Sequence, residues 1–178
     1  GLVTAGSATE DRDPRHARHC RGSGTIASRY VPAVTTHLPP MDLGSPGVEP
    51  RAAAAAAATR IRELTGVDRH DVALVLGSGW AGALDLIGET LAEVPQTEVP
   101  GFPAARVKGH VGVIRSVRIG DSDRRALFFG ARTHLYEGRG VRQVVHGVRT
   151  AAAAGCRAIV LTNGCGGLRE EWGPGTPV

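Results

Sequence analysis

Short apolar runs alternate with helix-forming segments between residues 49 and 178. The runs at 72–76, 126–129 and 158–161 are continuously apolar, which is typical of strands buried on both faces of a sheet. Residues 112–119 and 124–130, separated by a polar turn, predict two neighbouring strands. Helices are predicted for the alanine-rich segment Ala52–Leu64, which Gly66 ends, and for residues 141–154, which Gly155 ends.

Proline and glycine interrupt this alternation in one long stretch. Residues 90–110 contain three prolines and two glycines and are therefore expected to form a long loop. The other strands alternate with helices and end in glycine-rich turns. This order predicts an α/β fold with a site at the carboxyl ends of its strands.

Residues 1–48 have a different composition from the rest of the chain. They lack periodicity and are rich in Gly, Ser, Pro, Arg and His, which is typical of disorder. Met41 is the single methionine, and the chain starts with Gly1. We expect residues 1–48 to be a disordered, non-native extension and residues 49–178 to be the domain, in preference to a transit peptide.

Charge and cysteine content exclude several classes of function. The formal net charge is only +4, and no basic stripe is interleaved with aromatic residues, so no nucleic-acid partner is expected. No apolar stretch of roughly 18 residues predicts a membrane span, and no secretory signal is expected. Three cysteines without a C-x-x-C pair support neither a metal site nor a disulfide framework, and a reduced, cytoplasmic setting is the default expectation.

The segment 132–138, Arg-Thr-His-Leu-Tyr-Glu-Gly, holds unusual chemistry for a strand end. If side chains alternate there as in a strand, Arg132, His134 and Tyr136 project to one side. A guanidinium suits an oxyanion, an imidazole adds a donor or a proton, and a phenol can stack on a ring. Glu137 could orient Arg132, a ligand hydroxyl or His110, or could be an exposed acid.

Gly77, Gly79 and Gly82 follow a strand and match the spacing of a dinucleotide fingerprint. The acidic residue expected about 20 positions later would be Glu98, which lies among prolines in a predicted loop. An anion-binding turn in which Ser78 adds a hydroxyl fits better. A tight turn without a ligand remains an alternative.

Two further loops offer hydrogen-bond donors. His110 lies between Gly109 and Gly112, although a lone histidine in a loop is more often simply exposed. Asn163-Gly164-Cys165-Gly166-Gly167 is a second glycine-rich turn after a buried strand and can present backbone N–H groups to an anion. Cys165 has no base placed beside it by sequence, so we expect a small apolar filler and no nucleophile.

These donors come from different loops of one predicted sheet and point to one ligand. The group consists of Ser78, His110, Arg132, His134 and the Gly164 amide. No pair of carboxylates indicates a glycosidase, and no Walker lysine follows a glycine loop. Free inorganic phosphate acting as a nucleophile therefore fits better than hydrolysis or kinase chemistry.

Five motifs in this order and spacing resemble the trimeric purine nucleoside phosphorylase family. They are Leu76-Gly77-Ser78-Gly79-Trp80, Val99-Pro100-Gly101-Phe102-Pro103, Gly109-His110-Val111-Gly112, Gly130 to Gly138, and Leu161 to Leu168. The resemblance runs from about Arg51 to Val178. It implies a phosphorylase/hydrolase-like three-layer fold with a central mixed β-sheet flanked by helices, truncated after its first half.

The resemblance also implies an activity and roles for individual residues. The reaction is phosphorolysis of purine (2'-deoxy)ribonucleosides to base and pentose 1-phosphate, with phosphate as co-substrate and without a metal or other cofactor. Ser78, His110, Arg132, His134 and the Gly164 amide would hold phosphate. The further roles implied are catalytic for His134 and Glu137, and nucleoside-binding for Tyr136, Asn163 and Cys165.

Two departures from the family pattern leave alternatives open. Gly164-Cys165 stands where the family usually has Ala-Ala, and Cys165 with residues 168–171 also resembles methylthioadenosine phosphorylase. The chain also lacks the half that would recognise the purine, so an inactive phosphate- or nucleoside-binding fragment is a further alternative. We expect no normal turnover from this chain alone, and a homotrimer for the full-length protein.

Overall fold

The computed structural model describes residues 41–77, 80–104, 112–173 and 175–177. The predictions for residues 1–40, Ser78 and His110 lie outside these ranges. Residues 41–48, at the end of the expected extension, form turns in which the Ser45 amide donates to the Asp42 carbonyl at 3.2 Å. Leu43 is buried there, so the described body of the protein begins before α1.

A five-stranded mixed sheet forms the centre of the molecule, in the order β2-β3-β4-β1-β5. Strands β1, β4 and β5 are parallel, whereas β2 pairs with β3 and β3 with β4 in antiparallel fashion. The strands are β1 (Val72–Val75), β2 (Gly88–Pro95), β3 (Val113–Ile119), β4 (Arg125–Phe129) and β5 (Ala158–Leu161). The helices are α1 (Pro50–Thr65), α2 (Leu84–Ile87), α3 (Gly140–Val144) and α4 (His146–Ala153), with short 3₁₀ turns at Ala81–Ala83, Gln96–Glu98 and Leu135–Glu137.

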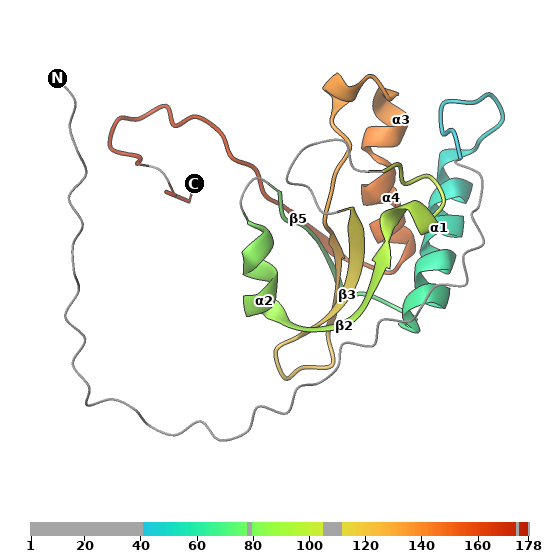
Figure 1. Ribbon diagram of the computed structural model, residues 1–178, viewed down its shortest axis with the longest axis horizontal. Coiled ribbons are helices and arrows are strands. Elements are labelled where there is room, and N and C mark those ends of the chain that lie inside the picture. Colours follow the sequence, from blue (N-terminus) through green and yellow to red (C-terminus); the bar gives the residue numbers. More distant parts are fainter. Residues whose placement is uncertain (1–40, 78–79, 105–111, 174, 178) are drawn as a thin grey trace.

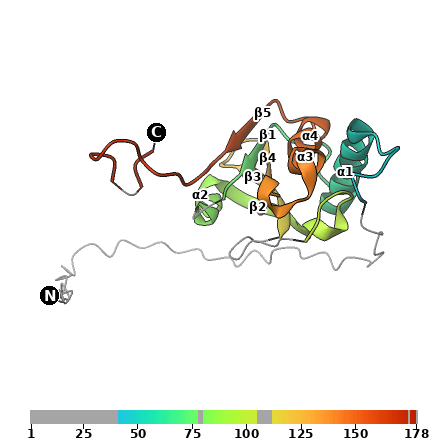
Figure 2. The ribbon, with the colours of Figure 1, turned by 90° about the horizontal axis from the view of Figure 1, so that it is seen from above.

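Helices cover both faces of the sheet, which gives the three layers that the sequence predicts. Figures 1 and 2 show α1, α3 and α4 on one side and α2 on the other. Successive residues of a strand point to opposite faces, so Ala73 and Val75 pack with Ile61 of α1, whereas Leu74 packs with Leu84 of α2. The continuous apolar runs of β1 and β4 are therefore strands buried on both faces, as expected.

Helix α1 begins and ends as its sequence indicates. Glu49 caps its start by accepting from the Ala52 amide at 2.8 Å, and Gly66 ends it in a left-handed conformation. Its alanines at 53, 54, 57 and 58 are buried, and small side chains let α1 pack closely against α4. The alanine run is therefore a packing surface.

Two predicted elements differ from the structure. Residues 90–95, which we expected to begin a long loop, belong to edge strand β2 (Gly88–Pro95), and Pro95 is its last residue. An edge strand tolerates proline because it needs fewer ladder donors. The helix predicted for 141–154 is divided into α3 and α4 at Val145.

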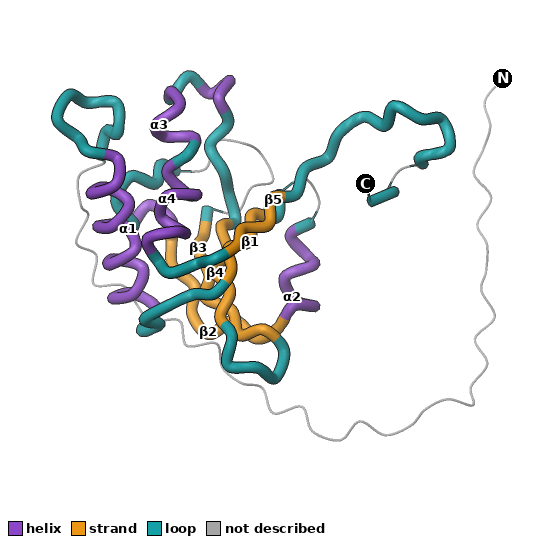
Figure 3. The backbone as a smooth tube through the Cα atoms, turned by 180° about the vertical axis from the view of Figure 1, so that it is seen from behind, coloured by secondary structure: helices purple, strands orange, loops and turns teal. Residues whose placement is uncertain are grey.

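Strand β5 forms the other edge of the sheet and is poorly covered. Val160 is 46% exposed and Leu161 is 55% exposed, although an apolar parallel strand is normally covered on both faces. Beyond Leu161 the chain runs away from the sheet as a loop (Figures 1 and 3). β5 therefore forms an exposed apolar sheet edge.

Candidate functional site

The carboxyl ends of the three parallel strands lie side by side. Val75 of β1 is in register with Phe129 of β4 and with Leu161 of β5. The segments that follow these strands therefore leave the sheet at the same end. In an α/β sheet this is the position at which ligands bind.

Arg132, three residues beyond β4, joins these strand ends. Its Nη1 donates to the Thr162 carbonyl at 2.8 Å. A Cβ placed on Gly77 would lie 3.7 Å from Nη2 and 3.9 Å from Nε of Arg132, so the guanidinium lies against the backbone that leaves β1. Among the ion pairs of the described residues none involves Arg132, so this positive charge has no carboxylate partner there.

Residues 132–137 are not a strand, so the premise of alternating side chains is wrong. β4 ends at Phe129, and Leu135–Glu137 form a 3₁₀ turn capped by His134. The rings of His134 and Tyr136 nevertheless lie together, stacked with centroids 4.8 Å apart and planes 12° apart. Tyr136 is 75% exposed, so its outer face is open to a ligand.

Glu137 holds this turn in place. Its Oε1 accepts from the His134 amide at 2.7 Å, while the His134 side chain accepts from the Glu137 amide, which completes a capping box. Its Oε2 lies 3.6 Å from Nε of Arg139. Of the alternatives raised from the sequence, orientation of Arg132 receives no support from these contacts, and any contact with His110 lies outside the described residues.

A cavity of about 250 Å³ opens beside Arg132 and Glu137. Apolar side chains form much of its lining, among them Val75, Phe129 and Leu161 at the three strand ends. The combination of apolar walls with an arginine and a carboxylate is typical of pockets for small molecules.

Phe102 and Pro103, which belong to the loop 100–103, line one wall of this cavity. Three side chains hold carbonyls of this loop. His146 Nε2 lies 2.9 Å from the Pro100 carbonyl, Gln143 donates to the Gly101 carbonyl, and Gln96 donates to the Pro103 carbonyl. A carbonyl only accepts, so Nε2 of His146 carries the proton. Burial lowers the pKa of His146 below its usual value, against the effect of this hydrogen bond.

The stack of aromatic rings stiffens the same wall. Phe102 stacks on Phe129 with centroids 5.6 Å apart and also contacts the His146 ring at 4.9 Å. Three hydrogen bonds and these ring contacts order a loop that would otherwise lose considerable conformational entropy on binding a ligand. Residues 100–103, which precede His110 in the sequence, are therefore held in place.

The structure does not bring all predicted site residues together. Arg132 and Glu137 line the cavity, and His134 and Tyr136 lie in the same turn. Asn163, Gly164 and Cys165 are exposed in the segment that leaves β5 and do not line the cavity. Their proposed contacts with phosphate and nucleoside stay predictions.

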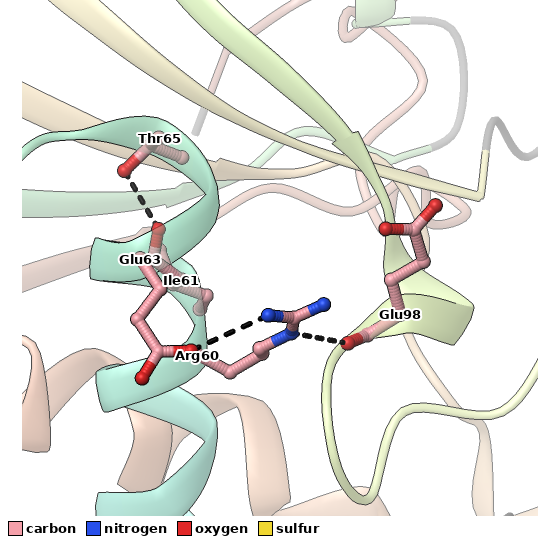
Figure 4. Close-up of polar contacts among 5 residues, drawn as sticks. All are labelled: Arg60, Ile61, Glu63, Thr65 and Glu98. Atoms are coloured by element: carbon pink, nitrogen blue, oxygen red, sulfur yellow. Dashed lines mark hydrogen bonds and ion pairs between the residues drawn. The ribbon is translucent and has the colours of Figure 1, made fainter. Parts of the chain in front are cut away.

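The dinucleotide interpretation is not supported by the topology. A dinucleotide-binding unit needs a second parallel strand beside the first, but β2 is antiparallel and lies at the far edge of the sheet. Glu98 lies in a 3₁₀ turn, where its carbonyl accepts from Nε of Arg60 at 3.4 Å, and its carboxylate points away from Arg60 (Figure 4).

Two kinds of feature are absent from the described residues. They contain no group of three or more His, Cys, Asp or Glu side chains arranged to hold a metal ion. Within the same ranges, no helix is long and apolar enough to cross a membrane.

Thr162 is a residue of this site that sequence reasoning missed. The Gly77 amide donates to its Oγ1 at 3.2 Å, and this Oγ1 lies 3.2 Å from the Val75 carbonyl, to which it donates. The available signal was a hydroxyl residue immediately after an apolar strand and before a glycine-rich turn. Gln96, Gln143 and His146 were not singled out as wall-forming residues either, because no local pattern marks them.

A scan against models of known protein families matches none of them to this chain. Among curated proteins, a purine nucleoside phosphorylase from Cellulomonas sp is 59% identical over 149 residues, which cover 81% of this chain and 53% of that enzyme. A purine nucleoside phosphorylase from Mycobacterium tuberculosis is 45% identical over 136 residues, 76% of this chain and 50% of that enzyme. The chain thus spans about half the length of the curated relatives it matches.

Solved structures agree with the sequence relatives. Isoform 2 of the Schistosoma mansoni purine nucleoside phosphorylase, in complex with cytosine and ribose-1-phosphate, superposes with a TM-score of 0.58 at 28% identity over 67% of this chain and 41% of that chain. The complex of a Schistosoma mansoni enzyme with inosine superposes with a TM-score of 0.57 at 26% identity, over 67% of this chain and 40% of that chain. By sequence and by fold, this chain belongs to the purine nucleoside phosphorylase family.

Proposed function

We propose that this chain supplies the phosphate- and ribose-binding part of a purine nucleoside phosphorylase. The reaction is phosphorolysis of purine (2'-deoxy)ribonucleosides to the base and (deoxy)ribose 1-phosphate. The observation that carries the proposal is Arg132, a cation without a carboxylate partner among the described residues, held between the ends of three parallel strands beside a cavity. Such a preorganised cation positions an anionic nucleophile and stabilises charge at the reacting centre.

In this proposal the neighbouring turn serves the sugar and the phosphate. His134 adds a donor to phosphate, and Glu137 acts through the capping box that fixes the His134 backbone. Tyr136, whose ring is stacked on His134 and exposed, contacts the ribose. Ser78, His110 and the Gly164 amide complete the phosphate site, and Asn163 and Cys165 line the nucleoside wall.

The co-substrate, the oligomeric state and the cellular location belong to the same proposal. We propose that inorganic phosphate is a co-substrate, that no further cofactor takes part, and that the whole enzyme is a homotrimer. A cytoplasmic location is supported by Cys156 and Cys165, both of which are free thiols.

Phosphate binding by the 178-residue chain tests the proposal directly. Isothermal titration with inorganic phosphate should give saturable binding, and Arg132→Lys should weaken it roughly 10- to 100-fold, because lysine keeps the charge but loses the planar fork. Arg118→Lys is the matched control, since Arg118 is paired with Glu89 on β2. Wild-type chain that binds no phosphate, or an Arg132→Lys variant that binds as well as wild type, would contradict the proposal.

The reaction itself is tested with the chain joined to the remaining half of the Cellulomonas relative. Phosphate-dependent release of hypoxanthine from inosine is expected from this fusion and not from the 178-residue chain alone. Methylthioadenosine as a competing substrate separates the sister activity. Faster turnover of methylthioadenosine than of inosine would replace the purine nucleoside assignment.

A further inference from the structure

Thr162 connects all three strand ends of the site. Its amide donates to the Val75 carbonyl at 3.1 Å, and its hydroxyl donates to the same carbonyl at 3.2 Å. The hydroxyl also accepts from the Gly77 amide at 3.2 Å, and the Thr162 carbonyl accepts from Arg132 at 2.8 Å. One residue therefore contacts the segments that leave β1, β4 and β5.

The Thr162 hydroxyl acts both as a hydrogen-bond donor and as a hydrogen-bond acceptor. It donates to one backbone group and accepts from another, which only a hydroxyl does at this size. Valine has nearly the same shape but can do neither, so it leaves the Gly77 amide without this acceptor. Serine keeps both hydrogen bonds and loses only the methyl group.

The two halves of Thr162 hold different parts of the site. Its backbone carbonyl holds the guanidinium of Arg132, whereas its side chain holds Gly77, the residue before Ser78 in the sequence. Nη2 and Nε of Arg132 remain on the side of the guanidinium that faces Gly77. The side chain of Thr162 thus sets the position of the Gly77 backbone relative to the donors of Arg132.

We propose that Thr162 is a positioning residue that preorganises the phosphate site by fixing the Gly77 backbone beside Arg132. This inference rests on the proposed function, because it takes Arg132 and the Gly77 backbone as parts of one anion site. Thr162 itself touches no reacting atom. It acts by holding the Gly77 backbone before phosphate binds, which is how preorganisation increases affinity.

The experiment compares Thr162→Val and Thr162→Ser in the 178-residue chain. The first readout is hydrogen exchange of the Gly77 amide by NMR, and the second is the dissociation constant for inorganic phosphate. Thr65→Val is a matched control, because the Thr65 hydroxyl also donates to a carbonyl, that of Ile61 at 2.7 Å (Figure 4), and accepts from the Val67 amide at 3.2 Å. Thr162→Ala removes the same hydroxyl and serves if the valine variant does not fold.

Thr162→Val should accelerate Gly77 exchange and weaken phosphate binding roughly 3- to 10-fold, the equivalent of one hydrogen bond. Thr162→Ser should leave both readouts close to wild type, and Thr65→Val should leave phosphate affinity unchanged. Unchanged Gly77 exchange in Thr162→Val overturns the inference, as does faster exchange with unchanged phosphate affinity. If the wild-type chain binds no phosphate, the proposed function is wrong instead. Hydrogen exchange of the Gly77 amide would still decide whether Thr162 holds the Gly77 backbone.

Discussion

Replacing Gly101 with alanine places a methyl group where the ring of His146 lies. Gly101 has a φ of +79°, which L-residues with a side chain rarely adopt. An added Cβ would lie 2.5 Å from Nε2 and 2.9 Å from Cε1 of His146. The backbone strain and the clash therefore act together at one position of the loop 100–103, whose residues Phe102 and Pro103 line the cavity.

The two contributions can be separated in magnitude. Left-handed backbone costs about 1–2 kcal/mol for an alanine, and overpacking a buried contact adds about 1–3 kcal/mol. Gly101→Ala should therefore lower the free energy of unfolding by about 2–5 kcal/mol. Gly66→Ala is the control, because Gly66 has a similar φ of +69° but open space around it, and about 1–2 kcal/mol is expected there.

Urea denaturation followed by circular dichroism measures both variants. A double-mutant cycle with His146→Ala isolates the clash, since removing the ring should recover about 1–3 kcal/mol of the Gly101→Ala loss. Equal losses for Gly101→Ala and Gly66→Ala would refute the contact with His146. So would strict additivity of Gly101→Ala and His146→Ala.

Two further predictions follow from buried groups. Burial lowers the pKa of His70 to about 4, from 6.5, and its Nε2 lies 2.7 Å from the hydroxyl of buried Ser116. The unfolded chain takes up this proton near pH 6.5 and the folded chain only near pH 4, so the free energy of unfolding should fall by up to about 3 kcal/mol over that window as pH drops. His70→Gln should flatten the pH profile of urea midpoints, and an unchanged profile would count against the assignment. Burial raises the pKa of the half-buried Cys156 thiol to about 11, whereas Cys165 is exposed. Iodoacetamide at pH 8 should therefore modify Cys165 well before Cys156 by mass spectrometry, and equal rates would contradict the burial of Cys156.

The local sequence pattern was sufficient to predict most of the helices and strands. The continuous apolar runs predicted β1, β4 and β5, although only β1 and β4 have the burial on both faces that such runs indicate. Gly66 predicted the end of α1 from capping chemistry alone, whereas the Glu49 cap at its start was seen only in the structure. β2 was missed because the prolines and glycines of residues 90–110 outweighed a weak alternation, although Pro95 only ends the strand.

The chemistry of the site was visible in the sequence, but its assembly was not. Arg132, His134, Tyr136 and Glu137 were found because their side chains are unusual beside a buried strand. The strand-like alternation expected for them was wrong, since the capping box between His134 and Glu137 favours a 3₁₀ turn. The stacked pair of His134 and Tyr136 therefore arises from turn geometry and not from the pleat of a strand.

The sequence by itself determined the order of strands and helices, the glycine-rich turns and the family. Tertiary structure alone decided which of these segments meet. Gly77 and Thr162 are 85 positions apart, and Gln143 reaches the Gly101 carbonyl across 42. Periodicity and capping act over a few residues, so hydrogen bonds of this separation leave no local pattern and emerge only when the parallel strands pair in register.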